Sequence, residues 1–126
     1  MVLDFAFFAY CISELLEEVA TIRYIRTTEY IRPLTVEEKI QKTFPEEPEN
    51  MVAIAMCESN LNQEAVSPTR DFGVMQVNEK TWDSTANEMG LDYKSDVDDN
   101  LKLARHIYEV QSKSAWVCWH LVAYNN

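Results

Sequence analysis

Apolar residues recur at steps of three and four in the first part of the chain, between Ser13 and Ile31. This spacing places them along one face of an α-helix, with polar residues opposite, and is typical of an amphipathic helix. Pro33 is expected to end the helix because proline cannot donate a backbone hydrogen bond. The stripe consists of Leu15, Leu16, Val19, Ile22 and Ile25.

Two further helices are indicated between residues 35 and 59. Thr35 and Glu38 have the spacing of a capping box, which predicts a short helix that ends near Phe44. An apolar segment after Pro45 predicts a helix from about Pro48 to Ser59. We expect the prolines to separate an amino-terminal helical arm, residues 1–45, from a second domain, residues 46–126.

The second domain continues with a polar loop over residues 60–71 and then a turn at Gly73 into a short extended stretch. Asn78 is a suitable N-cap for a helix that Gly90 ends. Ser95 or Asp96 is expected to cap the next helix, and residues 115–124 form the last one. The predicted fold is mainly α, with at most a small β-hairpin.

Composition supports a helical, globular chain. The 126 residues include 47% hydrophobic residues, only two glycines and four prolines, enough apolar residues for one ordinary core. The formal net charge is -10. Nucleic acid is therefore not an expected partner, because phosphate binding needs clustered Lys and Arg residues.

Glu58 is the strongest candidate for chemistry. It lies at the end of an apolar helix, and the turn Gly73–Gln76 follows fifteen residues later. Apolar surroundings keep a carboxyl group protonated, as an acid that cleaves a glycosidic bond must be. The alternative is an ordinary exposed carboxylate at a helix end.

Two motifs carry a resemblance to a known family. Glu58-Ser59 with the downstream Ala65-Val66-Ser67, and then Gly73-Val74-Met75-Gln76, resemble the paired signatures of soluble lytic transglycosylases and goose-type lysozymes. The resemblance runs from about Glu49 to the carboxyl end. It implies a lysozyme-like helical domain whose cleft binds peptidoglycan.

The resemblance implies roles for several residues. Glu58 would act as general acid and then as general base, and Gly73 would form the turn that lines the cleft. Gln76 would bind the sugar acetamido group. Met75 would pack beneath a ring, although plain core packing is equally compatible with the sequence. Ser59 would hold Glu58 or an acetamido oxygen, or would cap the helix end.

A second carboxylate separates the two possible reactions. A hydrolase usually needs one, and Asp71 is the leading candidate. Lytic transglycosylases do without it, because a group of the substrate attacks and an anhydro product forms. A tyrosine that faces the acid in the family matches Tyr124, and Tyr108 is a possible substitute; either is also compatible with a core aromatic residue.

Three cysteines allow one disulfide and one thiol, or three reduced thiols. We favour a disulfide between Cys57 and Cys118, because the helices that carry them are expected to pack together. No spacing of His106 and His120 with Cys or Asp residues indicates a metal site, and no cofactor is expected.

No segment has the eighteen or so consecutive apolar residues of a membrane span, and no secretory signal is recognisable. A peptidoglycan substrate nevertheless implies an extracytoplasmic location, with an export route that the sequence does not show. We therefore predict a peptidoglycan lytic transglycosylase. The alternatives are a muramidase that uses Asp71, a non-catalytic glycan-binding or envelope-assembly module, and a structural helical protein that matches the motifs by chance.

Overall fold

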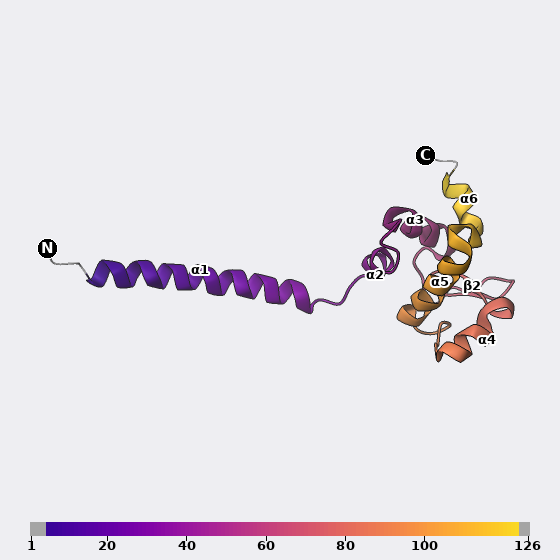
Figure 1. Cartoon of the computed structure of the whole chain (residues 1–126), viewed down its shortest axis with the longest axis horizontal. Coiled ribbons are helices and arrows are strands. Elements are labelled where there is room, and N and C mark those ends of the chain that lie inside the picture. Colours follow the sequence, from indigo (N-terminus) through magenta and orange to yellow (C-terminus); the bar gives the residue numbers. More distant parts are fainter. Residues whose placement is uncertain (1–4, 124–126) are drawn as a thin grey trace. The chain divides into compact units, whose positions relative to one another are not determined.

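A computed structural model describes residues 5–123 and the side chains of residues 9–23 and 32–123 (Figure 1). Over this range the chain is mainly helical, with six α-helices, one 3-10 helix and one hairpin of two short strands. The elements in order are α1 (Phe5–Ile31), α2 (Val36–Thr43), α3 (Pro48–Ser59), β1 (Asp71–Phe72), β2 (Val77–Asn78), α4 (Glu79–Met89), α5 (Val97–Gln111), η1 (Ser112–Ala115) and α6 (Val117–Ala123).

The chain divides into two units between Pro33 and Leu34, earlier than the boundary at residue 45 that the prolines suggested. The reason is that α2 buries Ile40 completely, together with Phe44, which follows the helix. These side chains belong to the core that α3 and α5 also form. The first unit is the helix α1, in which the predicted stripe is exposed at Leu15, Leu16, Val19 and Ile22, while Ile25 lies outside the described side chains.

Local capping signals account for where α2, α4 and α5 begin. Thr35 and Glu38 form the reciprocal bonds of a capping box at α2. The Asn78 side chain caps α4 and the Asp96 side chain caps α5, each by accepting the backbone N–H of the residue three positions later. Gly90 ends α4 in the left-handed conformation, as predicted.

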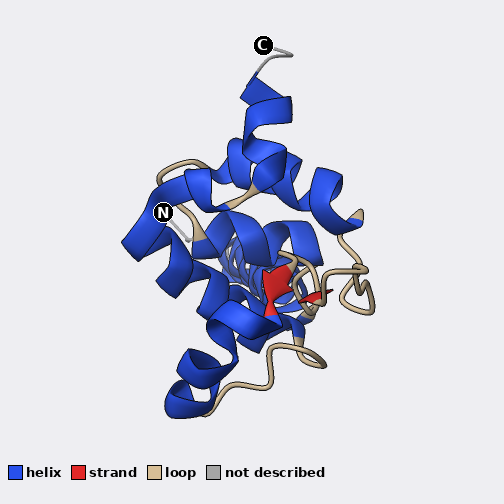
Figure 2. Ribbon diagram, turned by 90° about the vertical axis from the view of Figure 1, so that its right-hand side faces the viewer, coloured by secondary structure: helices blue, strands red, loops and turns tan. Residues whose placement is uncertain are grey.

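The hairpin is as small as the sequence predicted. Strands β1 and β2 are antiparallel, and Asp71 pairs with Asn78 while Phe72 pairs with Val77. Figure 2 shows the two strands, in red, among the helices. Val74 and Met75, in the turn between the strands, are fully buried. The hairpin is thus anchored in the core by its turn.

The carboxyl-terminal helix differs from the prediction of one helix over residues 115–124. The structure has the 3-10 turn η1, then an extended Trp116, then α6. Trp116 is buried and its indole N–H donates to the carbonyl of Met75 over 2.7 Å. This contact spans 41 residues, so local sequence signals do not show the break.

Within the described residues, no helix combines the length and the apolar character needed to cross a bilayer.

Candidate active site

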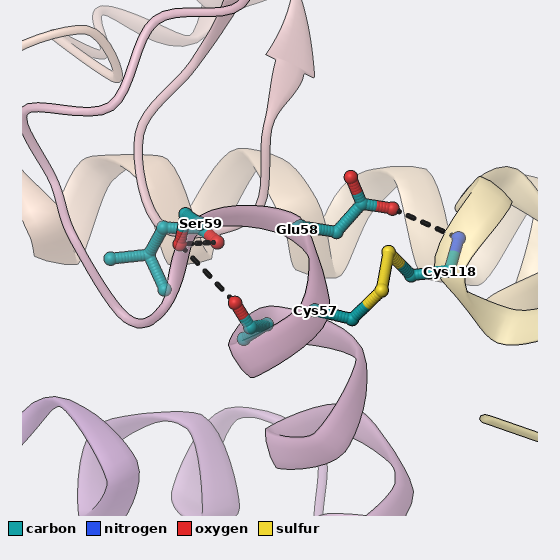
Figure 3. Close-up of a disulfide and its surroundings, with 6 residues drawn as sticks. Cys57, Glu58, Ser59 and Cys118 are labelled. Atoms are coloured by element: carbon teal, nitrogen blue, oxygen red, sulfur yellow. Dashed lines mark hydrogen bonds between the residues drawn. A yellow bond between two sulfur atoms is a disulfide. The ribbon is translucent and has the colours of Figure 1, made fainter. Parts of the chain in front are cut away.

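The candidate acid Glu58 sits in the last turn of α3. The helix ends at Asn60, whose backbone is left-handed (φ 54°) and whose N–H bonds to the carbonyl of Met56. Glu58 is half-buried and accepts a hydrogen bond from the backbone N–H of Cys118 over 3.1 Å. Its carboxyl group is thus held from the side of α6 (Figure 3).

Glu58 opens into a pocket of about 170 Å³. Asp71 and Gln76, from the hairpin region, line the same pocket. The structure thereby brings together three of the predicted site residues from segments up to eighteen positions apart in the sequence. The rest of the lining consists of Val77, Asn78, Trp82, Ile107, Gln111, Ala115, Trp116 and Val117.

The environment of Glu58 favours its protonated form. Burial is the largest effect and raises the pKa of its carboxyl group above the ordinary value. The hydrogen bond from Cys118 acts in the opposite direction, and the negative charge of Asp71 raises the pKa further. Glu58 therefore keeps its proton to a higher pH than an exposed glutamate.

Asp71 has the opposite tendency. Partial burial acts to raise its pKa, but hydrogen bonds from Ser67, Thr69 and Asn78 outweigh burial and lower the pKa. The pocket thus contains one carboxyl group that favours the neutral form and one that favours the charged form. Such a pair is a common arrangement for acid and base roles in one site.

A buried asparagine shapes the turn that carries Gln76. The Oδ1 atom of Asn100 accepts the N–H of Met75 over 3.0 Å, and its Nδ2 atom donates to the carbonyl of Phe72 over 2.9 Å. Gly73 has a φ of 77° and lies against Asn100, where a Cβ atom would collide with the amide. Gln76 closes the turn by donating its side-chain N–H to the carbonyls of Gly73 and Ala65.

The predicted binding residues Ser59, Gly73 and Met75 do not line the pocket. Met75 is fully buried, so its side chain has no surface to offer a sugar ring, and core packing describes it. The Ser59 hydroxyl lies 2.7 Å from the carbonyl of Val74 and 3.2 Å from that of Ala55, both of which accept. Ser59 therefore ties the end of α3 to the Gly73–Gln76 turn rather than holding Glu58.

The two tyrosine candidates have different outcomes. Tyr108 does not line the pocket. Its hydroxyl donates to Glu47 over 2.8 Å, and its ring packs edge-on against Phe44. The bond to Glu47 is the main reason why the pKa of Tyr108 is raised. Tyr124 lies outside the described residues.

Sequence reasoning missed several residues of the site. Trp82 lines the pocket from α4 and meets the ring of His106 edge-on at 6.1 Å. Asn100 is a polar residue on an otherwise apolar helix face, a signal that could have identified it. The N–H of Cys118 is a backbone donor, which no side-chain pattern reveals.

The predicted disulfide is present. Cys57 and Cys118 are bonded with a Cα–Cα distance of 5.9 Å, and Cys11 is a free thiol. The bond joins the end of α3 to the start of α6, beside Glu58 (Figure 3). Among the residues that the structure describes, no group of His, Cys, Asp and Glu side chains is arranged to hold a metal ion.

Comparison with known proteins assigns the chain to a family. Neither the curated proteins nor the solved structures provide a match. The family model described as "Transglycosylase SLT domain" matches residues 35–126. This range begins within one residue of the second structural unit and includes Glu58, Asp71 and Gln76. Because the match covers more than half of the chain, the protein belongs to the transglycosylase SLT domain family.

Proposed function

We propose that this protein cleaves the β-1,4 bond between N-acetylmuramic acid and N-acetylglucosamine in peptidoglycan, with Glu58 as the catalytic acid and base. Membership of the SLT family supports the substrate class. The observation that carries the catalytic role is the half-buried Glu58 carboxyl group in the pocket, with its raised pKa. A chance match of motifs in a structural protein would not require such an environment.

In the first step, the protonated Glu58 donates its proton to the bridging oxygen as the glycosidic bond breaks. Gln76 lines the same pocket, where an acetamido group of the sugar is its expected partner. In the second step, the Glu58 carboxylate accepts a proton from the C6 hydroxyl of the N-acetylmuramic acid residue whose glycosidic bond has broken. That hydroxyl attacks the anomeric carbon, and a 1,6-anhydro product forms.

A muramidase reaction is the second candidate, and Asp71 is the observation that favours it. This carboxylate lines the same pocket as Glu58, and its hydrogen bonds keep it ionised. It could direct a water molecule or stabilise the positive charge that develops on the sugar. The product would then carry a reducing end instead of an anhydro ring.

An extracytoplasmic location follows from the substrate of the family. The Cys57–Cys118 disulfide is consistent with it, because disulfides persist in oxidising compartments and are rare in the cytosol.

The test of the catalytic role is the Glu58→Gln variant on purified cell-wall sacculi. Glutamine keeps the shape of the side chain but has no proton to donate, so we expect the loss of turbidity to slow by at least about a hundredfold. Glu64→Gln is the matched control, since Glu64 is an exposed acid of the neighbouring loop and does not line the pocket. Sacculus binding without clearing by either wild type or Glu58→Gln would support the non-catalytic module instead.

Mass spectrometry of the released fragments separates the two reactions. Anhydro-ended muropeptides are expected if the protein is a transglycosylase, and reducing-ended muropeptides if it is a muramidase. An Asp71→Asn variant that keeps full activity would exclude Asp71 as an essential second carboxylate.

A further inference from the structure

Cys118 is connected to the segment of the candidate acid Glu58 by one covalent bond and one hydrogen bond. Cys57 immediately precedes Glu58, and its sulfur is bonded to Cys118 at the start of α6. The backbone N–H of Cys118 donates to Oε1 of Glu58. Figure 3 shows both connections between the end of α3 and α6. The same residue of α6 therefore carries the disulfide and contacts the acid.

Helix α6 is short and mostly exposed over the described range. It is seven residues long, and Cys118 is its only buried residue over the described range. Val117 and Leu121 are 77% and 59% exposed. A helix this short is unstable by itself in water, so its position depends on tertiary contacts.

The chain that leads into α6 is fixed to the core at Trp116 by contacts other than the disulfide. The buried indole of Trp116 donates to the carbonyl of Met75. Beyond it, Trp119 is half-buried and stacks under the ammonium group of Lys113, 3.9 Å from the ring centre. What the disulfide adds is the placement of Cys118 and the residues that follow.

We infer that the Cys57–Cys118 disulfide is the positioning device of the general acid: it holds the Cys118 N–H against Glu58 and keeps α6 beside the carboxyl group. The inference rests on the proposed function. Neither cysteine lines the pocket, so both are positioning residues. Cys57 is exposed, so a dithiol reductant can reach it. Two electrons and two protons from the reductant convert the bond to two thiols, and the reductant becomes a disulfide.

Release of α6 should have a predictable effect on the pKa of the Glu58 carboxyl group. Burial is the main reason that the Glu58 pKa is raised, and it outweighs the opposing bond from Cys118. Val117 of α6 lines the pocket with Glu58, so release of α6 should reduce the burial of Glu58 as well as remove the Cys118 hydrogen bond, and the pKa should fall towards its ordinary value. Asp71 on β1 remains as the charge that faces Glu58. On the other neighbouring elements, Lys113 of η1 is paired with Glu47, and His120 of α6 is exposed.

The experiment compares Cys11→Ala, which keeps the disulfide, with the triple variant Cys11→Ala/Cys57→Ala/Cys118→Ala. Alanine retains the N–H at position 118, so only the covalent link is lost. In the triple variant we expect unchanged helical circular dichroism and sacculus binding. The rate of clearing should fall about tenfold to a hundredfold, since misplacing a catalytic group by about 1 Å has an effect of that size. The alkaline limb of the pH–rate profile should move to lower pH.

Reduction of the Cys11→Ala protein with a dithiol, followed by reoxidation, should lower and then restore the rate. An equal rate with an unmoved alkaline limb in the triple variant would overturn the inference. Joint loss of the helical circular dichroism signal and of sacculus binding would also overturn it, because the disulfide would then be needed for the whole fold and not specifically for the position of Glu58.

The Glu58 pKa, followed by NMR of its labelled carboxyl carbon in oxidised and reduced protein, distinguishes this inference from the proposed function. A pKa that falls on reduction supports the positioning role even if no muropeptide is released. A pKa that does not change contradicts the positioning role, whatever the activity.

Discussion

At the scale of single residues, the site depends on two carboxyl groups with different surroundings. Glu58 is half-buried and has one hydrogen-bond donor, the Cys118 N–H, whereas Asp71 accepts from Ser67, Thr69 and Asn78. The same functional group therefore favours its neutral form in one position and its charged form in the other. The difference follows from burial, which is the main cause of the raised pKa at Glu58, and from the three side-chain donors that outweigh burial at Asp71.

This difference predicts a pH dependence. In the proposed mechanism Glu58 acts in its protonated form, so activity should be present below its raised pKa and should be lost as the pH rises through that value. Replacement of Asp71 by Asn removes a negative charge that raises the Glu58 pKa. We expect the alkaline limb of the pH dependence of kcat/KM to move to lower pH. Glu64→Gln is the control that should leave the limb in place, and an unmoved limb in Asp71→Asn would show that the two groups are not coupled.

The sequence motifs predicted Glu58, Asp71 and Gln76 as site residues, and in the structure all three line one pocket. The side-chain orientations of two other candidates, Ser59 and Tyr108, depend on hydrogen-bond partners that are distant in the sequence. The Ser59 hydroxyl bonds to a carbonyl fifteen residues away, and the Tyr108 hydroxyl bonds to a carboxylate 61 residues away. No local pattern contains such partners.

At the scale of elements, the hairpin turn and α5 are locked together. Asn100 of α5 is fully buried and forms hydrogen bonds to both sides of the turn. Its amide can lie this close to the backbone because residue 73 is a glycine, where a Cβ atom would collide with the amide. Helix starts, in contrast, follow from local signals: Pro48 at the first position of α3, and the side-chain caps Asn78 and Asp96 at α4 and α5. That is why these helices begin where the sequence predicted, whereas the break at Trp116 required the contact with Met75.

The two glycines provide a matched test of this packing. Both have a positive φ, so alanine at either position costs about 1–2 kcal/mol of backbone strain. A Cβ atom at Gly90 meets open space, whereas at Gly73 it collides with Asn100. Gly73→Ala should therefore lower the free energy of unfolding by at least about 1 kcal/mol more than Gly90→Ala. Urea unfolding followed by circular dichroism measures the difference, and equal values would contradict the role of Asn100.

At the scale of the whole molecule, the described core lies entirely in the second unit. Its buried residues run from Ile40 to Cys118. The family model begins at residue 35, close to the start of this unit at Leu34. The fold that carries the pocket is thus contained in residues 34–126.

Removal of residues 1–33 should therefore leave the second unit intact. We expect the shortened protein to unfold cooperatively, at the same urea concentration as the full chain, and to clear sacculi at the same molar rate. Circular dichroism and turbidity assays check both points. A shortened protein without a cooperative transition would show that α1 contributes to the core.

The net charge of -10 makes a separate prediction. Peptidoglycan and its attached polymers are usually anionic, so the two surfaces repel each other at long range. Salt shortens the Debye length from about 30 Å at 0.01 M to about 8 Å at 0.15 M. The rate of clearing should rise over this range, and a rate that falls steadily with salt would mean that attractive charge contacts dominate binding.

The sequence by itself determined most of the helices, the small hairpin and the family signatures, because these depend on caps, periodicity and motif spacing. It favoured the pairing of Cys57 with Cys118 but left three reduced thiols open, and the structure has the disulfide. Only the tertiary structure decided that Glu58 is half-buried beside the Cys118 N–H, that Asp71 is held ionised in the same pocket, and that Met75 packs in the core. The physical reason is that burial and hydrogen-bond partners come from segments far apart in the chain, and these set the acidity on which the chemistry depends.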